Sequence, residues 1–169
     1  NVVDGRYINL VLKASCPNAE DVMEYPFTIQ VENGVELGGM IMENTTLYPN
    51  VHYIVSSPLV VPEGITLTIM PGTVLKFKAN SSFNAANGSL VCVGTPEQPI
   101  VFTMADLETA YMSSLIFNNN EVEYAIFEDL YINPQLSGYY GINEAKLRNC
   151  VVRNCIAIAY LFEYTTFNN

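Results

Sequence analysis

Hydrophobic and polar residues alternate along residues 62–77, where turns separate two short strands. After the turn formed by Pro62-Glu63-Gly64, residues 65–70 alternate with period two, which is typical of a strand with one face on a core. Pro71-Gly72 breaks this strand, and the apolar positions resume at 74–77. Because the second turn is too short to hold a crossover helix, the pattern predicts a chain that winds in short strands.

The downstream sequence repeats this pattern. The blocks 122–129, 147–154 and 162–169 place apolar, charged, polar and small residues in the same order, and each block ends in Asp or Asn. The step from the second block to the third is shorter than the step from the first to the second. Such repeats without a helical pattern are typical of a solenoid of strands. Asparagines such as Asn149 and Asn154 fall near the predicted bends, where Asn tolerates a left-handed backbone.

Two alternating segments near the start of the chain, residues 6–14 and 25–31, predict a further pair of strands. A turn-rich segment from Cys16 to Asp21 separates them. Residues 3–7 and 27–33 resemble the last two strands of the immunoglobulin-like repeats of large bacterial and archaeal surface proteins. Two strands cannot bury both faces of a sandwich. The resemblance therefore implies that the missing strands come from elsewhere or that the hairpin lies on the next domain.

Residues 60–77 and 88–103 closely resemble the opening coils of right-handed parallel β-helix proteins that bacteria and archaea export. The resemblance depends on the corners Pro62-Glu63-Gly64 and Pro71-Gly72-Thr73 and the strands that follow them, and it extends over roughly residues 54–169. It implies the fold and export from the cell. It does not imply a chemistry, because this architecture is found in lyases, adhesins, tail spikes and passive surface proteins.

We therefore expect an all-β chain, with a right-handed parallel β-helix of about five coils preceded by an antiparallel β-hairpin or partial sandwich. The expected division is residues 1–33 for the immunoglobulin-like hairpin region, 34–53 for a connector and cap, and 54–169 for the parallel β-helix. Of the 169 residues, 50% are hydrophobic and 14% are charged, which is enough apolar material for a substantial core.

Charge and candidate modification sites bear on partners and location. The net charge of −10 would repel a phosphate backbone, so nucleic acid is not expected as a partner. The longest apolar run, residues 156–162, is far shorter than the roughly 18 residues of a membrane-spanning helix. No leader opens the chain, so we expect a cytosolic protein or the mature form of an exported one. Acceptor patterns for N-glycosylation at Asn44, Asn80 and Asn87 favour an extracellular or cell-surface location.

The chain has four cysteines and lacks the paired spacing of zinc sites, so we expect no metal and no cofactor. The cysteines are expected to be small buried hydrophobic residues, with disulfides as a further expectation among Cys16, Cys92, Cys150 and Cys155. Cys150 and Cys155 are separated by an odd number of positions, which on a strand sends their side chains to opposite faces. A disulfide between these two would therefore need a turn.

One group of charged residues offers a candidate site. Polysaccharide lyases and hydrolases with this fold resemble one another in having acidic clusters that bind calcium or act as acid and base, with an Arg or Lys beside them. Glu121 and Glu123 share one face of a strand, and with Arg148 one coil away they could imitate such a site. The alternative is a structural ladder of alternating charge formed by Glu123, Arg148 and Glu163. We expect the ladder and no catalytic residues.

These observations favour a non-enzymatic extracellular structural protein, as a subunit or segment of a surface layer, sheath, filament or adhesin. Nothing in residues 162–169 would cap the last predicted coil, so we expect either a longer surface protein or a head-to-tail homopolymer of this chain. The alternative is a carbohydrate-binding or degenerate polysaccharide-lyase module. Its partners would be glycans, which could stack on some of the eleven tyrosines.

Overall fold

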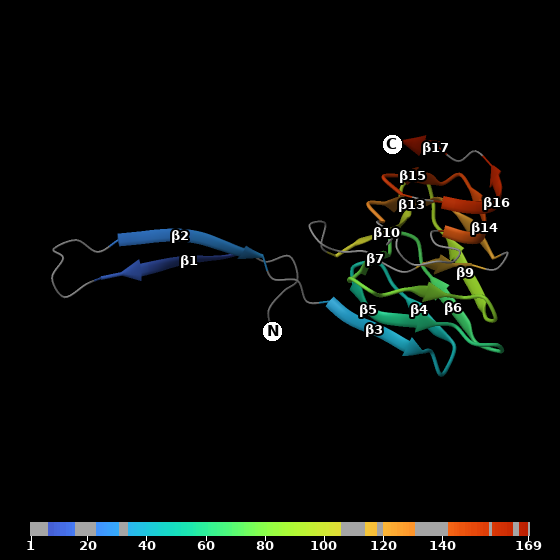
Figure 1. Cartoon of the computed structure of the whole chain (residues 1–169), viewed down its shortest axis with the longest axis horizontal. Helices are drawn as coiled ribbons and strands as arrows, with labels where there is room; N and C mark the ends of the chain where they lie inside the picture. The colour runs from blue at the N-terminus through green and yellow to red at the C-terminus, as the bar shows by residue number, and fades with distance from the viewer. Residues whose placement is uncertain are drawn as a thin grey trace. The chain divides into compact units, whose positions relative to one another are not determined.

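The computed structural model describes residues 7–15, 23–30, 34–105, 114–117, 120–130, 142–155, 157–163 and 166–168. Within these ranges the elements are β-strands joined by turns and bends. Contacts divide the chain into two units, Asn1–Gly34 and Val35–Asn169. Each unit is described on its own below (Figure 1).

The first unit contains an antiparallel hairpin of β1 (Tyr7–Ala14) and β2 (Met23–Gln30). Tyr7 pairs with Gln30 at one end and Ala14 with Met23 at the other, without a bulge between them. The N-terminal hairpin expected from the alternating sequence is therefore confirmed.

The second unit is built from short strands. They are β3 (Gly34–Met40), β4 (Thr45–Leu47), β5 (His52–Val60), β6 (Thr66–Ile69), β7 (Val74–Phe77), β8 (Phe83–Asn84), β9 (Ser89–Val93), β10 (Ile100–Met104), β11 (Leu115–Ile116), β12 (Glu121–Glu123), β13 (Ala125–Glu128), β14 (Ile142–Arg148), β15 (Val151–Arg153), β16 (Ala157–Glu163) and β17 (Thr166–Asn168).

These strands stack in three parallel columns (Figure 1). Column A contains β4, β6, β9, β12 and the ends of β14 and β16. Column B contains the start of β5, then β7, β10, β13, β15 and β17. Column C contains the end of β5, then β8, β11 and the starts of β14 and β16. The chain passes through the columns in the order A, B, C and then repeats, so the expected parallel β-solenoid is confirmed.

The register of the stacked strands follows the sequence repeats. Val122 pairs with Leu147, and Leu147 pairs with Phe162, so the first residues of the three blocks lie directly over one another. In column B, Val152 pairs with both Phe127 and Phe167, which occupy the same place within their blocks. The three sequence blocks are therefore successive coils of the solenoid.

Corners with a left-handed backbone turn the chain from one column to the next. Gly64 and Gly72 have φ of 79° and 80°, and the N–H groups of Ile65 and Thr73 each donate to the carbonyl three residues earlier. Glycine suits these corners because it has no Cβ to oppose a positive φ. Asn149 and Asn154 also have positive φ, as expected from their position at bends. The Asn154 amide donates to Asp129 Oδ1 of the preceding coil at 2.9 Å.

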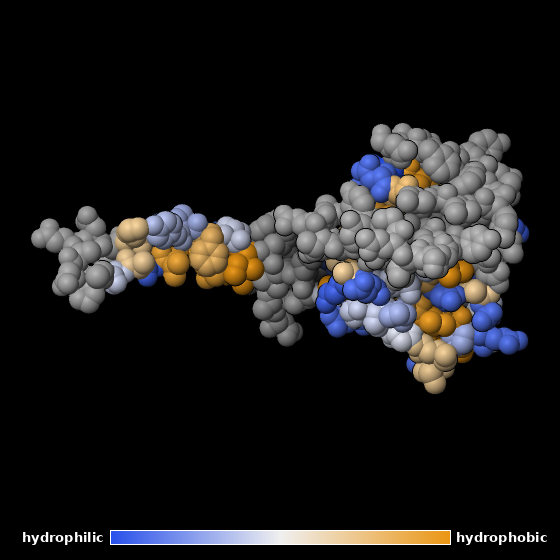
Figure 2. Space-filling model, in the orientation of Figure 1, coloured by the Kyte–Doolittle hydropathy of each residue, from blue (hydrophilic) through white to orange (hydrophobic). Residues whose placement is uncertain are grey.

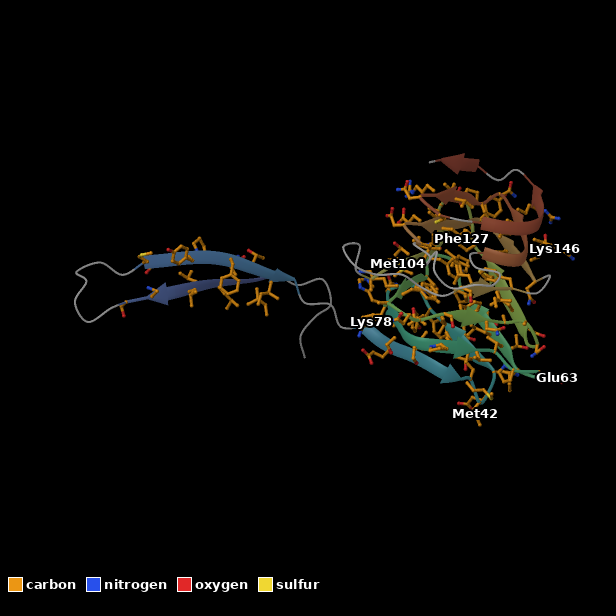
Figure 3. The ribbon with its side chains drawn as sticks, viewed as in Figure 1. Met42, Glu63, Lys78, Met104, Phe127 and Lys146 are labelled. Atoms are coloured by element: carbon orange, nitrogen blue, oxygen red, sulfur yellow. The ribbon has the colours of Figure 1, made fainter. Side chains whose placement is uncertain are left out.

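The inward-facing side chains form one apolar core. Five phenylalanines lie at its centre and are fully buried: Phe77, Phe83, Phe102, Phe117 and Phe127. The rings of Phe102 and Phe127 stack with centroids 4.9 Å apart, because these residues pair in adjacent strands of column B. Phe117 meets both of these rings edge-on from column C. Figure 3 shows Phe127 inside the coils, whereas Lys146 points away from them.

The solenoid begins earlier than the sequence boundary at residue 54. In the segment expected to be a connector and cap (34–53), β4 already pairs with β6, and β3 pairs with β5. Most residues of β3 are exposed, and β4 is only three residues long. Neither strand therefore has the long alternation of apolar and polar residues that predicts the other strands from the sequence.

Replacing Phe102 with alanine tests the ring stack. Phe102→Ala removes a buried ring that contacts three others, and we expect it to lower the free energy of unfolding by about 3–5 kcal/mol. The control is Val101→Ala on the outward side of the same strand, with an expected loss below about 1 kcal/mol. Equal losses for the two variants in urea unfolding would contradict the assignment of Phe102 to the core centre.

Candidate functional site

The candidate charged site lies on the outward side of column A. In β12, Val122 is buried in the core, so Glu121 and Glu123 on either side of it point outward. Glu121 pairs with Lys146, and Glu123 pairs with Arg148 in the next coil. The parallel register therefore brings two carboxylates and two basic side chains together on one outer surface.

Arg148 forms an ion pair diagonally across the coils. Its Nη1 atom lies 2.5 Å from Glu121 Oε1, and both side chains are partly exposed to solvent. Glu123 Oε1 accepts a hydrogen bond of 3.2 Å from the Asn149 amide. Both carboxylates therefore bind groups of the next coil, an arrangement that stabilises the stack.

The expected charge ladder has its residues at successive paired positions in column A: Glu123 pairs with Arg148, and Arg148 pairs with Glu163. The Glu163 side chain lies outside the described residues. The alternation in the sequence predicts the outward face of Glu121 correctly, but it does not indicate that this residue is the ion-pair partner of Arg148. A diagonal partner is missed when only residues at the same block position are compared.

A second set of charged contacts follows the outward side of column B. Arg153 Nε lies 2.8 Å from Glu128 Oε2, and the two residues pair directly across β13 and β15. Next to this pair, Asn154 bonds Asp129. Contacts between adjacent coils therefore recur on two sides of the solenoid.

A hollow of about 150 Å³ lies at the corner between columns A and B. Thr95, Pro96 and Pro99 of one coil line it, together with Tyr124 and Asn149 of the next coils. Tyr124 has φ of 49°, a left-handed conformation that is uncommon for an aromatic residue. A Cβ added to Gly94 would lie 2.3 Å from the Tyr124 carbonyl oxygen, so only glycine fits beneath this corner. No sequence motif pointed to this hollow.

The described cysteines do not form the expected disulfides. Cys92, Cys150 and Cys155 are free thiols, and Cys16 lies outside the described residues. Cys92 pairs with Val122 and belongs to the inner ladder of column A. The Cys150 thiol is within hydrogen-bond reach of two carbonyl oxygens, that of Arg148 at 3.2 Å and that of Val122 at 3.4 Å. The register thus gives Cys92 apolar neighbours in its ladder, as expected for a small buried hydrophobic residue.

Burial raises the pKa of all three thiols. It raises the pKa of Cys150 and of Cys155 to about 11, and that of Cys92 still higher. The cause is the loss of hydration of the thiolate. These groups therefore stay protonated near neutral pH, which disfavours a role as nucleophiles.

The three predicted glycosylation acceptors all lie on the surface. Asn44, Asn80 and Asn87 are exposed. Asn44 Oδ1 accepts a hydrogen bond of 2.8 Å from the Thr66 N–H, and Asn80 is at a corner with φ of 62°. Each side chain is at a turn or beside a strand end.

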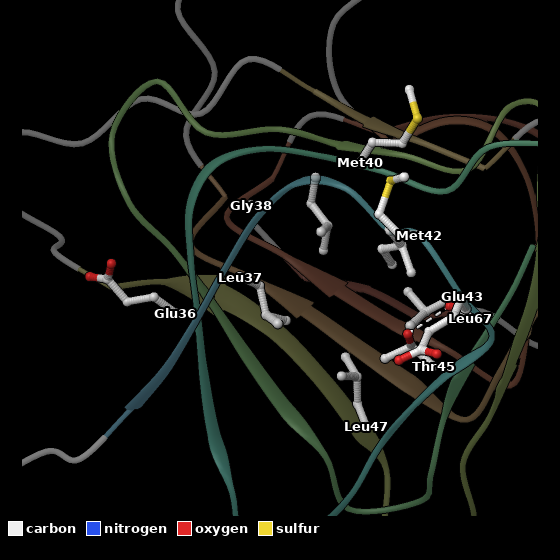
Figure 4. A pocket seen from close by; sticks show the side chains of 11 residues that line it. Glu36, Leu37, Gly38, Met40, Met42, Glu43, Thr45, Leu47 and Leu67 are labelled. Atoms are coloured by element: carbon white, nitrogen blue, oxygen red, sulfur yellow. Dashed lines mark hydrogen bonds between the residues drawn. The ribbon is translucent and has the colours of Figure 1, made fainter.

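A larger hollow lies at the N-terminal end of the solenoid (Figure 4). It measures about 350 Å³, and residues of β3, the following segment and the first coils line it. Most of these residues are apolar, but Glu36, Glu43 and Thr45 are among them. Met40 and Met42 lie at this hollow and are exposed by 58% and 81%. Leu47, Leu59 and Leu67 form the apolar lining deeper in the coils. Core side chains of the first coils therefore border an open hollow.

The described part of the chain contains no group of three or more His, Cys, Asp or Glu residues that could hold a metal ion. It also contains no helix with the length and hydropathy to cross a membrane.

The comparison with protein families agrees with the three-column architecture. Residues 39–113 match the pectate-lyase-like β-helix domain family. The expected resemblance to parallel β-helix proteins is therefore confirmed, and the match begins within β3, before the boundary at residue 54 that the sequence analysis proposed. No curated protein and no solved structure significantly matches the chain.

A double-mutant cycle tests the ion pair in this β-helix domain. Arg148→Met and Glu121→Gln should each destabilise the domain by up to about 1 kcal/mol, because both partners are partly exposed. The double variant should lose less than the sum of the single losses. We expect the coupling energy from chemical unfolding to shrink in high salt. Coupling that is absent at low salt would contradict an ion pair between coils.

Alkaline unfolding tests the burial of Cys150. A thiol whose pKa is raised by folding contributes full stability below its unfolded pKa, near 9, and loses that contribution as the pH rises through about 11. The equivalent position in the preceding coil is Ala125, so Cys150→Ala should fold. Between pH 9 and 11 we expect the unfolding free energy of this variant to fall less steeply than that of the wild type. Parallel curves for the two proteins would contradict the raised pKa.

Proposed function

We propose that this chain is a non-enzymatic structural β-helix module of an extracellular or cell-surface protein. The observation that carries the proposal is that the outward charged residues bind across the coils. Arg148 pairs with Glu121, Arg153 pairs with Glu128, and the Asn149 amide bonds Glu123. These contacts join adjacent coils and stabilise the solenoid as a scaffold.

The same contacts disfavour catalysis at the candidate site. A general acid or base must be within hydrogen-bond reach of the group that it protonates or deprotonates. Here Glu121 is bound to the Arg148 guanidinium, and Glu123 accepts a hydrogen bond from the Asn149 amide, so both carboxylates are engaged by groups of the next coil. The charged group on column A thus has the contacts of a structural element.

An extracellular location is supported by the surface chemistry. The chain carries a net charge of −10, and its three glycosylation acceptors are exposed. Glycans attached at Asn44, Asn80 and Asn87 would meet solvent and would leave the core intact. This is the surface that a secreted or cell-surface solenoid needs.

Assembly with further strands is supported by the N-terminal end of the solenoid. Among the described strands, β4 is at the end of the strand order and pairs with β6 on one side. An unpaired strand edge is a template for another strand. The hollow at this end is lined in part by the apolar side chains of Met40, Leu47 and Leu67, which could receive side chains of that strand. The proposed partner is a further copy, stacked head to tail, or another segment of a longer surface protein.

Carbohydrate binding is a second candidate function, favoured by the hollow at Tyr124. An aromatic ring beside Pro96, Pro99 and an Asn amide offers an apolar surface and a polar group to a sugar ring. The match to the pectate-lyase-like family gives this candidate further support. A binding module and a degenerate lyase would both retain such a surface.

Incubation with polygalacturonate, with and without calcium, tests the proposal. We expect no unsaturated oligosaccharide to form, and we expect Arg148→Met to behave as the wild type does in this assay. Product formation by the wild type that is lost in Arg148→Met would show that the charged site is catalytic and would overturn the proposal.

The same preparation can test the two non-enzymatic alternatives. A structural module that stacks end to end should form elongated assemblies visible by electron microscopy. Retention of a monomeric protein on immobilised polygalacturonate, reduced at least tenfold by Tyr124→Ala, would instead favour the carbohydrate-binding module. Thr95→Ala, a change of a smaller side chain in the same hollow, is the matched control.

A further inference from the structure

The hairpin of the first unit has one apolar face. Side chains that are directly paired in an antiparallel ladder lie on the same side of it. Ile8 pairs with Ile29, Leu10 with Phe27 and Leu12 with Tyr25. Since these positions alternate along both strands, all six side chains lie on one face, which we call the apolar face. Their exposed fractions range from 38% at Ile8 to 59% at Leu12.

The opposite face of the hairpin contains the polar and charged pairs, with Val11 paired to Pro26 between them. Thr28 Oγ1 donates a hydrogen bond of 2.9 Å to Asn9 Oδ1, and Lys13 Nζ lies 2.6 Å from Glu24 Oε1. Figure 2 shows apolar side chains gathered along one side of the hairpin and more hydrophilic ones along the other. This division is typical of a sheet with one face in water and the other against a second layer.

The described residues of the first unit, 7–15 and 23–30, do not supply that second layer. Its described strands form a two-stranded sheet, and an isolated two-stranded hairpin is at best marginally stable in water. Stability requires the apolar face to be covered. A second sheet packed about 10 Å above the first would do this.

We propose that the apolar face packs against the apolar face of a second copy of this chain, forming a closed two-fold pair. The two faces are then the same surface, and such self-complementary contacts are usual in two-fold dimers. Each hairpin supplies the layer that the other lacks. This contact is separate from the head-to-tail stacking of solenoids and does not depend on it.

The area of the face is sufficient for such a pair. Seven large apolar side chains are available, because Met23 lies on the same face and is also exposed. About half of each of these side chains is exposed, which is roughly 100 Å² per residue. One hairpin therefore offers about 700 Å² of apolar surface. Two copies would bury about 1,400 Å², within the range of about 1,200–2,000 Å² for stable interfaces.

The charge distribution also favours a second copy. The chain carries a net charge of −10, which opposes self-association over most surfaces. The paired positions of the apolar face contain no charged residue, and the Lys13–Glu24 ion pair lies on the opposite face. Two copies can therefore meet at this face without bringing like charges together.

Sedimentation of the full chain over a wide concentration range tests this proposal. We expect the wild type to form a dimer. The variant Leu10→Lys/Phe27→Glu places a cross-strand ion pair on the apolar face, and we expect it to dissociate at least a hundredfold more readily. The matched control Asn9→Lys/Thr28→Glu makes the same change on the polar face and should dimerise as the wild type does.

A cross-linking experiment tests the proposed pair even if the charged variant does not fold into its hairpin. Under mild oxidation, Leu10→Cys should form an intermolecular disulfide much faster than Asn9→Cys, its neighbour on the polar face. Equal rates would overturn the proposal. A wild type that stays monomeric at all concentrations, as it would if another part of the chain covered the face, would also overturn it.

Discussion

Parallel stacking in register is the constraint on which the solenoid depends. Each coil forms its backbone hydrogen bonds with the coils on either side, so every inward position must lie over an inward position of its neighbour. A shift of one residue would turn a whole strand's apolar side chains to solvent. The ladder through Ile69, Cys92 and Val122 and the stack of Phe102 on Phe127 both depend on this register. The corners are needed for this register, because they bring the chain back to column A at the start of each coil.

The same constraint explains the character of the outer surface. Because strands pair directly, a charged residue in one coil meets the residue at the same height in the next, as Glu128 meets Arg153. Opposite charges at such positions favour the stack, and like charges would oppose it. The carboxylates of Glu121, Glu123 and Glu128 all contact groups of the next coil. The charged group on column A therefore has the composition of a catalytic cluster but contacts that join adjacent coils.

The parts that the sequence predicted well are those where period-two alternation and corner residues agree. The blocks beginning at 122, 147 and 162 predicted the correct register, including the short last step, because apolar, charged and small positions recur together. The corner asparagines Asn149 and Asn154 were recognised for the same reason.

Other features could not be predicted, because they depend on contacts between positions that no repeat aligns. The diagonal pair Arg148–Glu121 and the hollow under Tyr124 are of this kind. The strands β3 and β4 were missed because a mostly exposed strand and a three-residue strand leave almost no alternation to recognise. The disulfides expected from an even number of cysteines are not seen among the described thiols, because an even count does not determine which strands bring two cysteines together.

The unequal spacing of the coils has an evolutionary consequence. In column A, Leu67 pairs with Leu90, Cys92 with Val122, and Leu147 with Phe162, so the length of chain between stacked positions differs widely from coil to coil. The strands keep their register while the segments between them differ in length, so insertions and deletions at the corners leave the stacked strands unchanged. A lineage can therefore change the loops that this scaffold displays without redesigning the interior.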